Sequence, residues 1–324
     1  MSPEKLNKFI LFFSAAYVLL LVVITFELIT KIQFMAGGSL HGFAQARDSI
    51  NADFINERNI YNLFRFYHLG LVSILFLFCF IDKIEKKQQI ILFILGLASA
   101  LLTTSRLFLL FYVLTLIAIF YTSKKINLKQ VLLCAIGFIV VFFGIALLMK
   151  KGSEESNSVI GMLLWNIQVY LFSPLAAFNH SLKSGVVTAE VLVLVPNSLK
   201  RILNYFGGHF QYRYNLMPFV NVPVRTNVYT FLFPLYHDGG KKLICLGCFV
   251  LGFFHQIIYL LNVAFRNPVT LYVFSISLYP IAISFFEDAY FSSPGFLAVQ
   301  AIPLLIFALY FKLGFSGKGR ILHE

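Results

Sequence analysis

Eight stretches of the sequence, each 15 to 23 residues long, consist almost entirely of apolar residues. A helix that crosses a bilayer needs about 20 such residues. The chain of 324 residues is 59% hydrophobic and 12% charged, whereas soluble domains carry about 25% charged residues. We therefore expect an all-α, polytopic integral membrane protein of about eight transmembrane helices, a single membrane domain over residues 1–324. The stretches are Phe9–Ile29, Tyr61–Ile81, Ile90–Thr104, Leu107–Thr122, Val131–Met149, Leu243–Phe265, Val269–Phe286 and Phe296–Phe311.

The positively charged residues favour one orientation of these helices. If the N-terminus is cytoplasmic, the cytoplasmic segments together hold twelve Lys and Arg residues. The short outer loops then hold only Lys31, Arg47, Arg58 and Arg106, with Arg65 at the edge of a span. Since Lys and Arg accumulate in short cytoplasmic loops, both termini are predicted to be cytoplasmic.

Residues 150–242 separate the fifth and sixth apolar stretches and are predicted to form a large outer loop. Within it, Ser158–Phe178 is apolar with polar interruptions, which predicts a re-entrant or interfacial helix. Lys200–Tyr214 is rich in basic and aromatic residues, which favour the membrane interface. We expect the loop to lie as a cap on the outer leaflet. One further pair of spans within it would bring the number of transmembrane helices to ten.

Several function classes find no support in the sequence. The net charge of +12 comes from Lys and Arg spread over many short loops, which argues against a nucleic-acid partner. No Walker motif, GxGxxG, HExxH or GxSxG occurs. Cys245 and Cys248 have CxxC spacing but no second pair to complete a zinc site. We expect no nucleic-acid partner, no metal and no cofactor.

Polar and ionisable side chains concentrate in Pro223–Lys242, directly before the sixth apolar stretch. Among them, a guanidinium can hold a pyrophosphate through paired charged hydrogen bonds, and His and Asp can accept protons. The alternative interpretation is an interfacial arginine with an aromatic belt, followed by a polar turn into the next span. The candidates are Arg225, Asn227, Tyr229, Thr230, Tyr236, His237 and Asp238.

Pro223 predicts that a helix begins near Thr226 in this stretch. On such a helix Arg225, Tyr229 and Tyr236 would share one face. Adjacent residues do not face each other on a helix, so His237 and Asp238 are not expected to pair automatically.

Other polar residues lie at the predicted outer face. Arg106 follows Thr103-Thr104-Ser105 between two spans, where it either meets a partner or snorkels to lipid headgroups. His209 and Arg213, with Tyr212 and Tyr214, could bind sugar or phosphate, although an amphipathic surface helix is the favoured explanation. Glu287 and Asp288 are expected in a solvated outer loop. The alternative is that this pair of acids binds a sugar or a cation.

Three local motifs, in this order, resemble those of the Wzy-type polymerases, which polymerise oligosaccharide repeat units of O-antigen and capsule. The first is Thr104-Ser105-Arg106 between two spans. The second is the Tyr170…Pro174…Phe178 segment early in the outer loop. The third is Asn227-Val-Tyr-Thr230…Tyr236-His-Asp238-Gly-Gly240 before a late span. The resemblance covers about residues 95–265.

The resemblance implies a metal-independent, GT-C-like glycosyltransferase in the bacterial inner membrane. It would join undecaprenyl-pyrophosphate-linked oligosaccharides on the periplasmic face, within lipopolysaccharide or capsule biosynthesis. Arg225 and Arg106 would bind pyrophosphate, and Asp238 or His237 would act as base or orient the acceptor. Asn227, Tyr229, Thr230, Tyr236, Tyr170, His209 and Arg213 would contact substrate. A chain-length regulator and a flippase of the same pathway are the expected protein partners.

Two other functions remain open from the sequence. An O-antigen ligase performs the same bond chemistry with a different acceptor. A lipid-linked oligosaccharide flippase or transporter would carry charges along a central pathway and often a two-half symmetry. The central apolar stretches here are nearly free of charge and no internal repeat is evident, which favours the polymerase.

Overall fold

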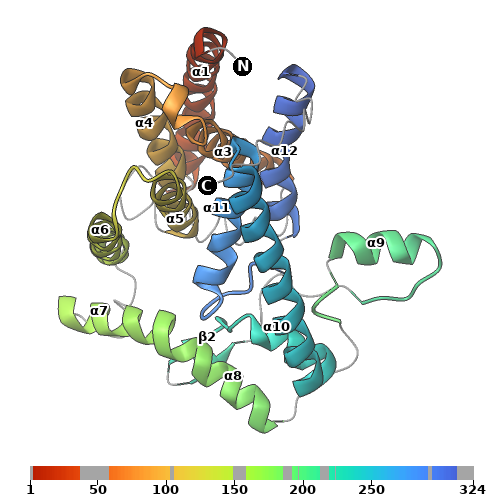
Figure 1. Cartoon of the computed structure of the whole chain (residues 1–324). Coiled ribbons are helices and arrows are strands. Elements are labelled where there is room, and N and C mark those ends of the chain that lie inside the picture. Colours follow the sequence, from red (N-terminus) through yellow and green to blue (C-terminus); the bar gives the residue numbers. More distant parts are fainter. Residues whose placement is uncertain are drawn as a thin grey trace. The chain divides into compact units, whose positions relative to one another are not determined.

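A computed structural model describes residues 3–36, 58–102, 106–148, 158–184, 192–195, 197–211, 219–222, 224–290 and 294–311 (Figure 1). The chain is mostly helical, as predicted, and each of the eight apolar stretches coincides with a helix. These helices are α1 (Pro3–Ala36), α3 (Arg58–Phe78), α4 (Lys86–Leu102), α5 (Arg106–Thr122), α6 (Leu128–Leu148), α10 (Leu232–Phe265), α11 (Pro268–Ile283) and α12 (Pro294–Phe311).

The remaining elements form the predicted outer loop, apart from one 3₁₀ turn, η1 (Ile81–Lys83). In the loop, α7 (Val159–Ile167), the π-helical turn η2 (Gln168–Phe172) and α8 (Ser173–Ser184) follow one another without a gap. Next come α9 (Asn197–Tyr205), β1 (Val220–Asn221) and β2 (Arg225–Thr226). The short antiparallel pair β1–β2 departs from an all-helical fold.

Three helical segments among the described residues are long and apolar enough to cross a membrane. They are Glu4–Phe26, Val159–Lys183 and Leu232–Phe265. Shorter apolar helices are Tyr67–Phe78, Leu107–Thr122, Leu128–Gly144 and Pro268–Ile283. The total of eight spans stays a prediction. Val159–Lys183 adds a candidate that the eight do not include. The segment is helical, and the re-entrant or interfacial placement expected for it stays a prediction.

The chain divides into two compact units. The first comprises residues 1–135, 258–276 and 298–324, and in it α3 contacts α1, α4 and α5 (Figure 1). The Tyr17 hydroxyl lies 2.8 Å from the Ser99 hydroxyl. A Cβ at Gly70 would lie 2.0 Å from the Tyr17 ring. Glycine therefore allows α1 and α3 to approach closely, as small residues do between membrane helices.

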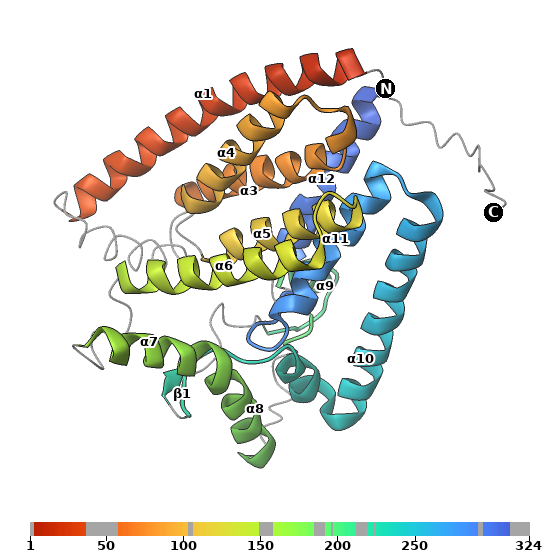
Figure 2. The ribbon, with the colours of Figure 1, turned by 60° about the vertical axis from the view of Figure 1, so that its left-hand side comes forward.

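The second unit comprises residues 136–257 and 277–297. It contains every described residue of the predicted outer loop, and also the loop between α11 and α12. It contains a hydrophobic cluster of Ala177, Tyr229 and Phe233, against which Phe178, Val220 and Val222 pack. Figure 2 shows β1 beside the α7–α8 helix, and α8 contacts β2.

Helix α10 is two helices joined at Gly240, whose φ of 63° and ψ of −156° interrupt the helical conformation. Only glycine adopts this backbone region readily. The first part, residues 232–239, carries the predicted site residues Tyr236, His237 and Asp238. The second part exposes Phe249 and Phe253, as expected of a surface that faces lipid.

Candidate active site

Asp238 fastens a distant segment of the outer loop to α10. Its Oδ1 accepts a hydrogen bond of 2.9 Å from the backbone N–H of Val193. Its Oδ2 accepts one of 2.7 Å from the N–H of Leu194. Both carboxylate oxygens are therefore engaged by the main chain of residues 193–194, and only 4% of the side chain is exposed.

His237 is the third partner of this carboxylate. Its Nδ1 lies 2.8 Å from Oδ1 of Asp238, and since a carboxylate oxygen accepts hydrogen bonds, we assign Nδ1–H as the donor. The histidine side chain is 9% exposed. Its ring lies 5.8 Å from that of Phe233. The sequence did not lead us to expect this pair, because neighbouring side chains on a helix diverge; the two side chains nevertheless turn toward each other.

Arg225 lies in a short hairpin and not on a helix, so the helical face predicted for Arg225, Tyr229 and Tyr236 is wrong. In the hairpin, Asn221 pairs with Arg225 and Val220 with Thr226, and α10 begins only at Leu232. Arg225 is exposed, and its guanidinium lies 4.8 Å from the centre of the Phe219 ring. An exposed cation held over an aromatic face is available to an anionic ligand.

Residues 227–231 connect β2 to α10 and pack inward. Tyr229 is buried, with its ring 4.3 Å from that of Phe233, and burial raises the pKa of its phenol. Thr230 is 2% exposed. Within the part of the chain that the structure describes, its Oγ1 has no hydrogen-bond partner. Asn227 is half-buried on the same segment.

Tyr170 and Tyr236 both pack against other aromatic rings. Tyr170 lies in η2, with ring centres 5.5 Å from Phe142 and 6.1 Å from Phe286, both in edge-to-face geometry. Tyr236 packs at 5.9 Å against Phe178 of α8. A π-helical turn within an α-helix is frequently found at functional sites, and here it presents Tyr170 between α6 and the loop after α11.

Glu287 and Asp288, between α11 and α12, are not solvated as expected, which corrects that expectation. Asp288 is 6% exposed, and Glu287 is partly buried. Burial, and then the charge of Asp288, raise the pKa of Glu287 to about 7. The sequence hinted at this only through position, since the two acids stand between apolar runs, next to Ala289 and Tyr290.

No contact among the described residues joins His209, Arg106 or Arg213 to this site. His209 is exposed on the segment after α9. Arg106 begins α5 in the first unit, and its side chain lies outside the described residues, as do Thr103–Ser105. Arg213, Tyr212 and Tyr214 also lie outside them. The described residues hold no group of three or more His, Cys, Asp or Glu side chains placed to bind a metal ion.

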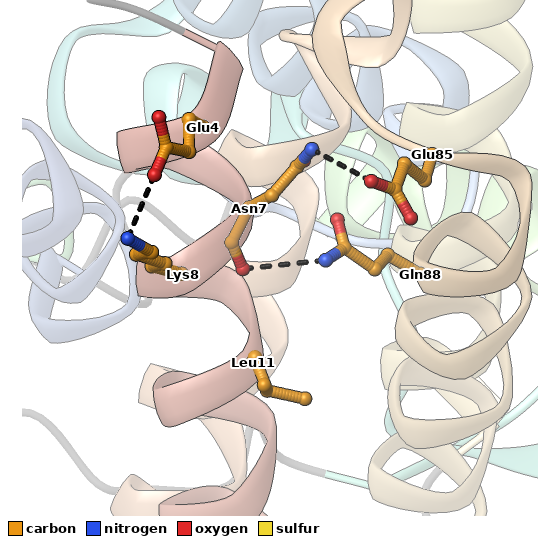
Figure 3. Close-up of a pocket in the computed structure, with 6 residues that line it drawn as sticks. All are labelled: Glu4, Asn7, Lys8, Leu11, Glu85 and Gln88. Atoms are coloured by element: carbon orange, nitrogen blue, oxygen red, sulfur yellow. Dashed lines mark hydrogen bonds and ion pairs between the residues drawn. The ribbon is translucent and has the colours of Figure 1, made fainter.

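A cleft of about 390 Å³ lies at the start of α1 and α4, in the first unit (Figure 3). Asn7 donates to Glu85 at 3.2 Å, and Gln88 donates to the Asn7 carbonyl at 3.2 Å. Glu4, Lys8 and Leu11 complete its lining. None of the predicted site residues lies there, and the predicted orientation makes this end of the helices cytoplasmic.

Comparison with known proteins supports the resemblance drawn from the motifs. The family described as "Putative O-antigen polymerase" matches residues 58–171. This match includes Arg106 and Tyr170 and ends before the segment that carries Arg225 to Asp238. A protein named O-antigen polymerase, from Shigella dysenteriae, is 27% identical over 215 residues, which are 64% of this chain and 53% of that protein. The chain thus spans about half the length of this curated relative. No solved structure matches this chain.

Proposed function

We infer that this chain, a relative of the O-antigen polymerases, joins lipid-linked oligosaccharide repeat units into a surface polysaccharide, either O-antigen or capsule. The observation that carries the inference is the similarity over 64% of the chain to a protein named O-antigen polymerase. The order of the three motifs supports it independently. We place the chain in the bacterial inner membrane, with about eight spans, cytoplasmic termini, a GT-C-like arrangement and the reaction on the periplasmic face.

The proposed reaction transfers a growing glycan from its carrier to a new repeat unit. A hydroxyl oxygen of the acceptor unit bonds to the anomeric carbon of the donor glycan. The bond between that carbon and the pyrophosphate of the carrier lipid, which we take to be undecaprenyl pyrophosphate, breaks. The pyrophosphate leaves with the electron pair, and the hydroxyl proton passes to a base. Neither a nucleotide nor a cofactor is required, and we propose that no metal is required.

In this proposal Arg225 stabilises the charge that develops on the leaving pyrophosphate. Its exposure and its position over Phe219 support that role. Arg106 and Arg213 are proposed as further cations for the same group, and His209 and Tyr170 as contacts to substrate. Asn227, Tyr229, Thr230 and Tyr236 shape the pocket beside the hairpin.

His237 and Asp238 hold the architecture of the proposed site. Because Asp238 accepts three hydrogen bonds, we propose that the pair orients residues 192–195 and the first part of α10 around the acceptor. The chain-length regulator and the flippase are proposed partners of the membrane-embedded surface.

The test is a gel of surface polysaccharide from a strain that lacks this chain, complemented with wild type or Arg225→Ala at equal protein level. We expect the deletion to leave single capped repeat units and to lose the multi-unit ladder. Loss of capping as well would indicate a ligase, and an unchanged ladder would exclude the polymerase. If lipid-linked units instead failed to reach the outer leaflet, a flippase would explain the chain better.

A further inference from the structure

Residues 284–290, the described part of the loop between α11 and α12, are tied to the two segments that frame the proposed site. The Ser284 carbonyl accepts a 3.0 Å hydrogen bond from the Phe231 N–H. The Phe286 ring meets Tyr170 of η2 at 6.1 Å, and the Tyr290 ring lies 6.2 Å from Phe231. Glu287 therefore stands on a loop whose main chain and flanking rings are fixed against residues 227–231 and η2.

Its neighbours in the loop form an ordered polar set. Asp288 Oδ1 accepts a 3.0 Å hydrogen bond from the Tyr290 N–H. The Tyr290 hydroxyl lies 2.9 Å from Nε2 of His255 on α10. For Glu287, burial and the charge of Asp288 raise the pKa, and among the described residues no hydrogen bond to its carboxylate contributes. This carboxylate differs from that of Asp238, whose two oxygens are both engaged by backbone N–H groups.

In the segments that hold this loop, two buried hydroxyls lack hydrogen-bond partners among the residues that the structure describes: Oγ of Ser173 and Oγ1 of Thr230. Ser173 is 0% exposed and Thr230 is 2% exposed. Thr230 directly precedes Phe231, and Ser173 lies one turn after Tyr170, so both belong to the segments that hold the loop. An unsatisfied buried hydroxyl costs about 1–3 kcal/mol. A ligand that is itself rich in hydroxyls would remove this cost.

We propose that Glu287 is the base that takes the proton from the attacking sugar hydroxyl, and that Ser173 and Thr230 bind the acceptor sugar beside it. This assignment rests on the proposed polymerase function. The acceptor oxygen forms its bond to the anomeric carbon as its proton moves to the Glu287 carboxylate, and the pyrophosphate leaves with the electrons of the broken bond. The proton then passes to water. A base works best when its pKa lies near the working pH, and that of Glu287 is raised to about 7.

Other titratable groups face Glu287, and each of them could also produce a pH effect. Asp288 adjoins it and raises its pKa, and Tyr279 of α11 interacts with it electrostatically. From α10, His255 reaches the loop through Tyr290. A pH effect is therefore assigned to Glu287 only if it disappears in Glu287→Gln and persists in His255→Gln.

The experiment uses full-length protein in detergent and the lipid-linked repeat unit extracted from a strain that lacks this chain. The rate of ladder formation is measured from pH 5.5 to 8.5. For wild type we expect the rate to rise with pH, with a midpoint near 7, because the carboxylate must be ionised to accept a proton. For Glu287→Gln we expect a loss of about 10²-fold or more at every pH. Asp82→Asn, an exposed acid of the first unit, serves as the matched control and should keep the wild-type rate.

Glu287→Gln with more than half of the wild-type rate and an unchanged pH profile would overturn the assignment, while polymerisation itself would stand. If wild type forms no ladder from the extracted unit, the proposed function fails instead. If Glu287→Gln does not fold, the proposed acceptor site is tested with Ser173→Ala and Thr230→Val. We expect both to keep or raise the unfolding temperature and to raise KM several-fold. Wild-type KM values at intact stability in both variants would exclude the site.

Discussion

The carboxylate of Asp238 and the backbone amide of Leu194 lie 2.7 Å apart, although 44 positions separate them in the chain. Together with the neighbouring bond to Val193, this contact fixes a segment between α8 and α9 against the first part of α10. Asp238, for which the sequence predicts a role as base or in orienting the acceptor, thus also connects two parts of the loop.

Replacing Asp238 by Asn should weaken this connection. One carboxylate oxygen becomes an NH₂ group that faces a backbone N–H, and an unsatisfied buried donor costs about 1–3 kcal/mol. We expect a lower unfolding temperature in detergent and a lower steady-state protein level. Asp82→Asn is the control, because Asp82 forms an exposed ion pair with Lys125, and such pairs contribute at most about 1 kcal/mol. Equal unfolding temperatures in both variants would contradict the connecting role.

Arg225→Ala should abolish the polysaccharide ladder without destabilising the fold. Arg225 is exposed, so its removal leaves no buried group unpaired. The lost stabilisation of the leaving pyrophosphate should reduce the polymerisation rate on the order of 10²-fold. Lys242→Ala removes an exposed cation from the start of the second part of α10 and should leave the ladder intact. A ladder lost equally in both variants would indicate a general effect of charge.

Phe219→Leu should act more weakly, through Arg225. The guanidinium lies 4.8 Å from the Phe219 ring, and an exposed cation–π contact is worth about 0.5–1 kcal/mol. We expect a few-fold increase in KM for the lipid-linked substrate and a nearly unchanged kcat, because the arginine is still present but less well held. The double variant with Arg225→Ala should be no worse than Arg225→Ala alone.

Gly240→Ala should disturb the joint within α10. The φ of 63° and ψ of −156° at this position suit glycine almost exclusively, so alanine should cost about 1–3 kcal/mol. Gly252 lies in the second part of the same helix, where an added Cβ would meet nothing within 4 Å. Gly252→Ala should therefore keep or slightly raise stability. Thermal unfolding of the two variants side by side measures the difference.

Protonation of Glu287 should make stability depend on pH in a defined direction. Its pKa is raised from 4.5 to about 7, so the folded protein binds more protons than the unfolded chain within that window. The contribution of Glu287 to the free energy of unfolding is then fully present below about pH 4.5 and is lost as pH rises through about 7. Glu287→Gln should lack this decline and unfold at a higher temperature than wild type at pH 8. A decline that persists in Glu287→Gln would have another source.

Much of the helical framework follows from the sequence, because apolar runs of membrane length leave a helix as the simplest way to satisfy every backbone hydrogen bond. The hairpin at Arg225 does not follow, because two-residue strands carry almost no periodic signal and Pro223 is compatible with either a helix or a turn. The pairing of His237 with Asp238 also escapes prediction. It depends on side-chain torsions at the end of a helix and on backbone amides supplied by residues 193–194.

The burial of Glu287 and Asp288 could not be predicted for a different reason. Acidic residues in a short loop usually face water, and no local pattern reveals that Phe231, Tyr170 and His255 reach that loop through tertiary contacts. The resemblance to polymerases pointed to the hairpin and to α10. It carried no information about the turn between α11 and α12.

The hydrogen bonds that hold the outer loop have a consequence for sequence divergence among related chains. These hydrogen bonds run to the main-chain amides of Val193 and Leu194 and from the amide of Phe231 to the carbonyl of Ser284. A backbone group is present whatever the side chain is, so these hydrogen bonds can survive substitutions at Leu194 and Ser284, whereas Val193 is buried and Phe231 packs against Tyr290. The frame of the outer loop can therefore persist through substitutions at these positions as long as the aspartate is kept.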